Sequence, residues 1–303
     1  MSTTRTWTVI DKRRNRKLAV AITGKRGLPF VWGHALQCSM QADEASTIFD
    51  WPGLAATAQL IRYDARAHGE SCDEHDPRGC RWESLAHDMW RVAEDCGANT
   101  AVLGGASMGC ATALHAAMQH PERVLGLVLV IPPTAWELRP RQARAYRIMA
   151  QVVRFSGRLP FRLAAMMLGK ATPGTPLRAM ARAVVRELAT RDPRNVEAAF
   201  KGAALSDLPS PDRLAQLGMP ALILAWQNDN AHPIGVAHRL ASLLPDATLV
   251  VAEDDAAIRC WPEDVKRFVG SIRQQQPKER VRVRRRQVAG NKHANSIASL
   301  PRP

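Results

Sequence analysis

A serine flanked by small residues is the clearest candidate for chemistry in the sequence. The run Gly105, Ala106, Ser107, Met108 and Gly109 follows an apolar stretch and opens a segment rich in helix-forming residues. Between a strand and a helix, such a run makes a tight turn that lifts the serine hydroxyl above the edge of a sheet. The amide after the serine then points to where an oxyanion would form. We therefore predict that Ser107 is a nucleophile.

The elements that must position this serine alternate along the chain. Apolar runs of strand length cover residues 28–32, 59–63, 100–104, 124–131, 221–225 and 248–251. Several are continuously apolar, as expected for strands buried on both faces. Apolar residues at helical spacing predict helices over residues 82–95, 107–119 and 262–273. The alternation predicts an α/β fold with a mostly parallel sheet and helices on both faces.

Residues 132–211 interrupt this alternation. They contain no clear strand but include helical stretches at 143–155 and 176–190, so a helical insertion is predicted. Between Leu138 and Lys170 there are eight basic residues and no acidic one, with apolar residues between them. Two interpretations stay open: a solvated basic face over a core-facing stripe, or a contact with an anionic ligand or membrane surface.

Composition excludes several classes of protein. With 303 residues, 46% hydrophobic and 23% charged, the chain is typical of a globular protein rather than a disordered or fibrous one. The net charge is +14, of which residues 273–303 supply +8 through nine basic residues and one acid. We predict a basic disordered tail over 274–303 on a mildly basic body. No specific nucleic-acid partner is expected.

No cofactor or metal is expected from the sequence. The six cysteines form no CxxC pair and no cluster at zinc-ligand spacing, and no Gly-rich nucleotide-binding sequence is present. The longest stretch without Asp, Glu, Lys or Arg, residues 98–121, contains glycines, a serine and two histidines, so no transmembrane segment is predicted. No signal peptide is recognisable, and a cytoplasmic location is expected.

Three further runs occur in order along the chain. They are Val-Trp-Gly-His-Ala-Leu at 31–36, Arg-Tyr-Asp-Ala-Arg-Ala-His-Gly-Glu-Ser at 62–71 and His-Pro-Glu-Arg-Val at 120–124. Together with the serine turn, they make residues 28–269 resemble the α/β-hydrolase superfamily. The resemblance implies an eight-stranded core formed by residues 1–131 and 212–273, with residues 132–211 as a helical cap.

The resemblance also implies roles for individual residues. It implies that Ser107 is the nucleophile and that the amides of Leu36 and Met108 form the oxyanion hole. The family places an aspartate four residues before a proline, after the strand that precedes the last one. Here Asp229 precedes Pro233 by four residues, so Asp229 is expected to be the acid.

The usual catalytic histidine is missing from its place. The family has it about seven residues before the proline that starts the final helix, and counting back from Pro262 reaches Asp255. We therefore expect Asp255 at the usual histidine position, where it could share a proton with Asp229, because two neighbouring carboxylates raise the pKa of one of them. The alternative base is His232, in the same loop as Asp229.

Three functions remain open at this stage. The first is a hydrolase of small carboxylic esters or lactones that uses Ser107 with a non-standard base. The second is a catalytically impaired hydrolase-like binding protein. The third is a scaffold that acts through its basic cap and tail on an anionic partner. The first is preferred, because the serine turn, the oxyanion loop and the acid are all present.

Overall fold

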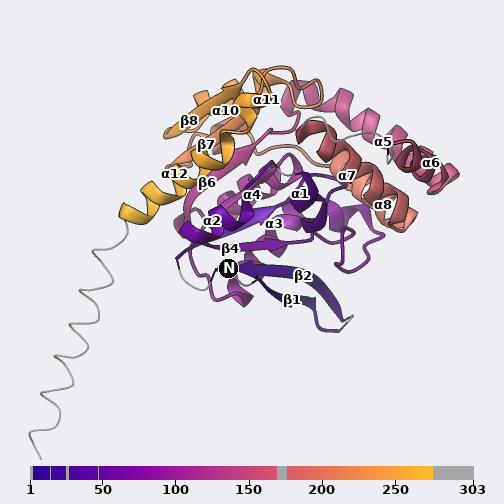
Figure 1. Cartoon of the computed structure of the whole chain (residues 1–303), viewed down its shortest axis with the longest axis horizontal. Helices are drawn as coiled ribbons and strands as arrows, with labels where there is room; N and C mark the ends of the chain where they lie inside the picture. Colours follow the sequence, from indigo (N-terminus) through magenta and orange to yellow (C-terminus); the bar gives the residue numbers. More distant parts are fainter. Residues whose placement is uncertain (1–2, 14, 25–26, 47, 169–175, 276–303) are drawn as a thin grey trace, which may run out of the picture.

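The computed structural model describes residues 3–13, 15–24, 27–46, 48–168 and 176–275 (Figure 1). An eight-stranded sheet forms its centre, with the strand order β1-β2-β4-β3-β5-β6-β7-β8. The strands are β1 (Thr3–Asp11), β2 (Arg16–Thr23), β3 (Leu28–Gly33), β4 (Ala58–Tyr63), β5 (Ala101–Ala106), β6 (Val124–Val130), β7 (Ala221–Trp226) and β8 (Ala247–Ala252). From β4 to β8 every neighbouring pair is parallel, so the predicted α/β class is confirmed.

The six strands expected from apolar runs all form, with small shifts at their ends. The hairpin β1–β2 was missed, and it joins the sheet antiparallel to β4. β1 gives little apolar signal, since its first five residues are exposed. The predicted tail lies outside the described residues from residue 276 onward, and the last helix, α12 (Trp261–Gln275), extends two residues beyond the predicted end of the core.

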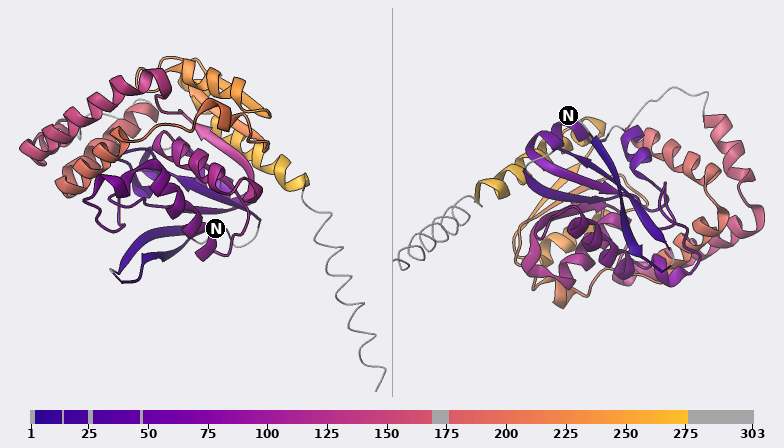
Figure 2. Two further views of the ribbon diagram at one scale, coloured as in Figure 1. Left: turned by 180° about the vertical axis from the view of Figure 1, so that it is seen from behind. Right: turned by 90° about the horizontal axis from the view of Figure 1, so that it is seen from below.

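Helices cover both faces of the sheet (Figure 2). One face packs on α3 (Trp82–Asp95), α4 (Met108–Gln119) and α10 (Ile234–Leu243). The opposite face packs on α2 (Trp51–Thr57) and α12, where Trp261, Val265 and Val269 are fully or almost fully buried. Parallel strands in this arrangement bring their carboxyl ends, and the loops that follow them, to one edge of the sheet.

The segment between β6 and β7 is helical. It contains α5 (Arg139–Ser156), α6 (Leu159–Leu168), α7 (Pro176–Thr190) and α8 (Pro193–Ala204). Figures 1 and 2 show these four helices together on one side of the sheet, with α6 at the rim of the molecule. Among the helices of the described ranges, none is both long and apolar enough to cross a membrane.

Candidate active site

Ser107 lies in the turn between the carboxyl end of β5 and the first residue of α4. Its backbone has φ 50° and ψ −104°, a strained conformation for a residue with a side chain. The amide of Ser107 donates to the carbonyl of Val130, the last residue of β6, at 2.9 Å. The neighbouring strand therefore holds the turn in place, with the serine at the carboxyl edge of the sheet.

Two glycines of the serine turn are required by close packing against β3. A Cβ atom on Gly109 would lie 2.0 Å from the carbonyl oxygen of Gly33, and a Cβ on Gly105 would lie 2.5 Å from the same atom. No side chain fits at these distances. The Gly-x-Ser-x-Gly spacing is thus the condition that lets α4 start directly against the end of β3.

Asp229 lies in the loop between β7 and α10. Its Oδ1 accepts hydrogen bonds from the amides of Ala231 at 2.8 Å and His232 at 3.1 Å. Its Oδ2 lies 2.7 Å from Nδ1 of His232. The short Asp-x-x-His spacing thus folds into a turn in which the carboxylate fixes both the backbone and the imidazole of the histidine.

The other side of the His232 imidazole faces the serine. Nε2 of His232 lies 2.9 Å from Oγ of Ser107. In the tautomer whose Nδ1 carries the proton, Nδ1–H donates a hydrogen bond to Asp229, and Nε2 can accept one from the serine hydroxyl. Ser107 is 5% exposed, and the side chains of His232 and Asp229 are 19% and 11% exposed. The three hydrogen-bonded groups are therefore mostly shielded from water, while part of the imidazole reaches the surface.

The charge of Asp229 is stabilised by its partners. Partial burial of the carboxylate opposes its ionisation, but the hydrogen bond from His232, the charge of that imidazole and the two backbone amides outweigh burial. The pKa of Asp229 therefore lies below its usual range. An ionised Asp229 can orient the imidazole and stabilise its protonated form, which is what a serine needs in order to lose its proton during attack.

The amides of Leu36 and Met108 are the expected donors of the oxyanion hole. In the described part of the chain, neither the Leu36 amide nor the Met108 amide donates a hydrogen bond to a protein acceptor. Met108 is the first residue of α4, where amides have no acceptor within the helix. Leu36 follows β3, which lies beside β5 in the sheet. Both amides therefore lie at the carboxyl edge of the sheet, one in the loop after β3 and the other at the start of α4.

Two buried histidines fix the loop that carries Leu36. His34 lies with Nδ1 2.8 Å from the carbonyl of Ala35 and accepts the Ala65 amide on Nε2 at 3.0 Å. His68 accepts the Gln37 amide on Nε2 at 3.2 Å. Burial lowers the pKa of His34 to about 4 and holds that of His68 well below the usual range. Both rings are neutral near pH 7, as these hydrogen bonds require.

A buried arginine ties the helical segment to the same loop. Arg191, between α7 and α8, donates to the carbonyl of Ala67 at 2.9 Å and to the side chain of Gln37. Burial lowers the pKa of Arg191 to about 10, so it stays cationic near neutral pH. In addition, Ser39 donates to Glu187 on α7 at 2.6 Å. Sequence reasoning did not identify Arg191, since a single arginine in a basic helical segment gives no signal.

Asp255 takes no part in this chain of hydrogen bonds. It is the first residue of the short helix α11 (Asp255–Ile258), which follows β8. Within the described ranges, no hydrogen bond joins its carboxylate to Ser107, Asp229 or His232. The loops after β7 and β8 do lie side by side, because Asn228 donates to the Glu253 carbonyl at 3.4 Å. The partner that Asp229 meets is nevertheless the histidine three residues further along its own loop.

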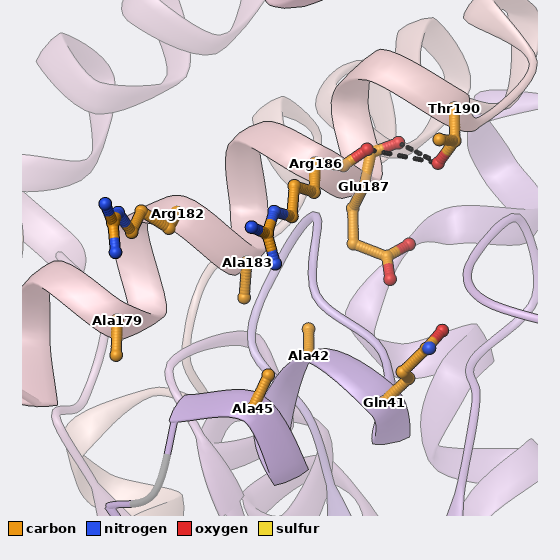
Figure 3. A pocket seen from close by; sticks show the side chains of 9 residues that line it. All are labelled: Gln41, Ala42, Ala45, Ala179, Arg182, Ala183, Arg186, Glu187 and Thr190. Atoms are coloured by element: carbon orange, nitrogen blue, oxygen red, sulfur yellow. Dashed lines mark hydrogen bonds between the residues drawn. The ribbon is translucent and has the colours of Figure 1, made fainter. Parts of the chain in front are cut away.

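A separate pocket of about 380 Å³ lies between α7 and α1 (Met40–Ser46) (Figure 3). Glu187 on α7 and Gln41 on α1 lie on its opposite walls. Arg182 and Arg186 add positive charge to the α7 wall. Neither Ser107 nor His232 lines this pocket, which is therefore distinct from the serine site.

Solved structures similar to this chain have the same fold. A thermophilic esterase from Thermogutta terrifontis is 25% identical with a TM-score of 0.71, and the match covers 89% of this chain and 99% of that one. A hydrolase from Pseudomonas aeruginosa PA01 is 20% identical with a TM-score of 0.71, over 88% and 97% of the two chains. An enol-lactonase from Burkholderia xenovorans LB400 is 18% identical with a TM-score of 0.61, over 88% and 98%.

The sequence agrees with these structural similarities. The family defined by the alpha/beta hydrolase fold matches residues 51–263, which include the serine turn and the loop of Asp229 and His232. The match covers more than half of the chain. The protein therefore belongs to the α/β-hydrolase fold family.

Proposed function

We propose that the protein hydrolyses small carboxylic esters or lactones, with Ser107 as nucleophile, His232 as general base and Asp229 as the group that orients the histidine. The observation that carries this proposal is the unbroken chain from Asp229 Oδ2 through the imidazole to Ser107 Oγ, with distances of 2.7 and 2.9 Å. Such a chain raises the nucleophilicity of a serine hydroxyl that is otherwise a weak nucleophile.

In the acylation step, Oγ of Ser107 attacks the carbonyl carbon of the substrate while Nε2 of His232 takes the hydroxyl proton. The carbonyl oxygen becomes an oxyanion, and the proposed donors to it are the amides of Leu36 and Met108. Collapse of this intermediate breaks the bond to the alkoxy oxygen, and His232 returns the proton to that leaving oxygen. An ester releases an alcohol here, whereas a lactone keeps its hydroxyl on the acyl chain.

Deacylation repeats the sequence with water. His232 takes a proton from a water molecule, whose oxygen attacks the acyl carbon bound to Ser107. The second oxyanion collapses, the bond to Oγ breaks, and the proton on His232 returns to Oγ. The product is a carboxylic acid, and the three side chains are restored.

The geometry favours His232 over Asp255 as the base. A carboxylate near its ordinary pKa of about 3.9 is a poor acceptor for a serine proton at neutral pH. The imidazole of His232 already lies at hydrogen-bond distance from Ser107, and imidazole is the side chain that most often acts as a general base. The expected carboxylate pair would leave His232 without a role, although it contacts both other members of the site.

The substrate class rests on two lines of support. Among similar solved structures are an esterase, an enol-lactonase and an enzyme that degrades N-acyl homoserine lactones. The helical segment 132–211 is proposed to act as the cap that encloses the acyl group, because Arg191 and Glu187 contact the loop that bears Leu36. We propose that a small acyl group binds between this segment and the loop that bears Leu36.

A fluorophosphonate probe tests the proposal directly, since it labels only activated serines. We expect the full-length protein to be labelled at one site and to hydrolyse a short-chain aryl ester, and we expect Ser107→Ala to abolish both. The matched control is Ser242→Ala, which removes an exposed serine hydroxyl on α10 that bonds to the Arg239 carbonyl instead of His232. Labelling that survives in Ser107→Ala would refute the assignment.

A further inference from the structure

Large apolar side chains gather on the surface of one helix pair. Nine of the eleven that are exposed in the described residues belong to the segment from residue 138 to residue 168. They form what we call the α5–α6 face: Leu138, Ile148, Val152, Phe155, Leu159, Leu163, Met166, Met167 and Leu168. Phe155, Met166 and Met167 are 85%, 71% and 81% exposed. Soluble monomers rarely expose so many large apolar side chains together, so this face marks an interaction site.

The α5 helix presents two apolar faces. Ala150 and Val153 are buried and belong to the cluster that packs on α8. Ile148, Val152 and Phe155 follow each other at intervals of four and three residues, so they share a different face, which is exposed. The packing of α5 on the protein is thus already complete without these three side chains.

The α6 helix has no buried residue at all. Leu159, Leu163, Met166 and Met167 also follow helical spacing, so α6 has an exposed apolar stripe of its own after the turn at Gly157. Figures 1 and 2 place α6 at the outer rim of the molecule, away from the sheet, in each view. The α5–α6 face is therefore a protruding surface rather than a groove.

The two helices that carry this face are also rich in arginine. The segment from Leu138 to Lys170 holds eight basic residues and no acidic one. Arg141, Arg144, Arg147 and Arg162 are exposed on the same two helices, and the exposed Arg154 lies 3.9 Å from Glu197 on α8. Long arginine side chains can reach past apolar neighbours to place their charge at a polar boundary.

We infer that the α5–α6 face docks on an anionic phospholipid bilayer. Apolar side chains on protruding helices can enter the boundary between headgroups and acyl chains, while arginines beside them meet lipid phosphates. An anionic bilayer therefore offers an apolar layer to the exposed side chains and negative charge to the arginines. This docking is peripheral, and it is independent of the chemistry at Ser107.

Charge argues against a second copy of the chain as the occupant. A symmetric dimer through this face would bring two sets of exposed arginines together without any acidic residue from the segment to offset them. The position of α6 at the rim of the molecule and the high exposure of Met166 and Met167 argue against a protein ligand that binds in a groove. A dimer through this face would be detected in the experiment that follows.

The test measures binding of the full-length protein to vesicles of phosphatidylcholine, with and without phosphatidylglycerol, by cosedimentation. Wild type should bind the anionic vesicles more tightly, and added salt should weaken this binding. Phe155→Ser/Met166→Ser/Met167→Ser should weaken it on the order of tenfold or more. Arg144→Gln/Arg147→Gln should weaken it about fivefold for each arginine lost.

The matched controls remove side chains of the same kinds at positions outside the α5–α6 face. Leu205→Ser removes an apolar side chain that is 52% exposed outside the α5–α6 face, and Arg78→Gln/Arg213→Gln removes two exposed arginines away from α5 and α6. Both should bind as wild type does. All variants are compared at equal helical content by circular dichroism, so that loss of folding is not read as loss of binding.

Three results would overturn the inference. The first is no binding of wild type to anionic vesicles, and the second is equal binding by the α5–α6 variants and wild type. The third is a dimer that dissociates in the apolar triple variant, seen by light scattering over a range of protein concentrations. That last result would assign the face to a second copy of the chain.

Discussion

Nε2 of His232 lies 2.9 Å from Oγ of Ser107, although the two residues are 125 positions apart in the chain. The same histidine reaches Asp229 only three residues before it. The loop after β7 therefore carries both the proposed acid and the proposed base, whereas the resemblance led us to expect the base in the loop after β8. One loop thus controls both the orientation of the imidazole and its distance from the serine.

Replacing the histidine tests the proposed base. We expect His232→Ala to lower kcat/KM for a short-chain aryl ester by roughly 10⁴-fold or more, because removal of one member of a serine triad leaves only the contributions of binding and the oxyanion hole. Thermal unfolding should change little, since the imidazole is part-exposed. His238→Ala on α10 is the control, as this histidine is exposed, and it should keep full activity.

Asp255 provides the opposite comparison. Asp255→Asn should leave kcat/KM within about twofold of wild type, because surface changes outside a site have small effects. Asp229→Asn should lower it by about 10⁴-fold, because the imidazole then loses the carboxylate that fixes its tautomer. Steady-state kinetics on wild type, Asp255→Asn, Asp229→Asn and His232→Ala distinguishes the two candidate bases. A loss in Asp255→Asn as large as that in His232→Ala would reinstate the carboxylate base.

The sheet was predictable from the sequence where its strands are buried. Continuous apolar runs such as those of β5 and β6 are typical of strands covered on both faces, and the Gly-x-Ser-x-Gly run specified the turn between β5 and α4. The hairpin β1–β2 was not predicted, because β1 begins with the exposed run Thr-Thr-Arg-Thr, which gives no apolar signal. Strand β2, by contrast, is buried over residues 18–21, so the sequence does contain a signal for this second strand of the hairpin.

The histidine was harder to predict for a different reason. Counting positions from Pro262 assumes that the base comes from the loop after β8, and this assumption led to Asp255. The sequence does contain a signal for His232, namely the Asp-x-x-His spacing before a proline in one loop. Whether that loop turns the imidazole toward Ser107 depends on backbone hydrogen bonds to Asp229, which no residue count reveals.

Backbone strain at Ser107 can be measured. With φ at 50°, Ser107 holds a conformation that glycine adopts more readily. We expect Ser107→Gly to be more stable than Ser107→Ala by about 1 kcal/mol in urea unfolding, since alanine keeps the strain while both lack the hydroxyl. Ser210→Gly against Ser210→Ala is the control pair, because φ there is −61°. Equal stabilities of the two Ser107 variants would mean that the turn is unstrained.

The buried His34 should make the free energy of unfolding depend on pH. Its folded pKa is about 4, below the ordinary value of about 6.5 expected in the unfolded chain. Between these values the unfolded chain binds the proton and the folded chain does not, so the free energy of unfolding falls as the pH drops from about 6.5 to about 4. The resulting fall in the free energy of unfolding is about 3 kcal/mol for this one group. The pKa of Asp43, raised by burial to about 7, acts in the opposite direction over an overlapping range.

The measurement must therefore compare two proteins that share Asp43. His34→Gln removes the titrating ring and weakens the fold, because Ala65 and Ala35 lose their partner. Its free energy of unfolding in urea should lie furthest below that of wild type near pH 7, and the gap should narrow as the pH falls toward 5, since only wild type carries the proton penalty there. His238→Gln, at an exposed position, should keep the wild-type dependence. A gap that stays constant from about pH 7 to about pH 5 would mean that His34 titrates normally in the folded protein.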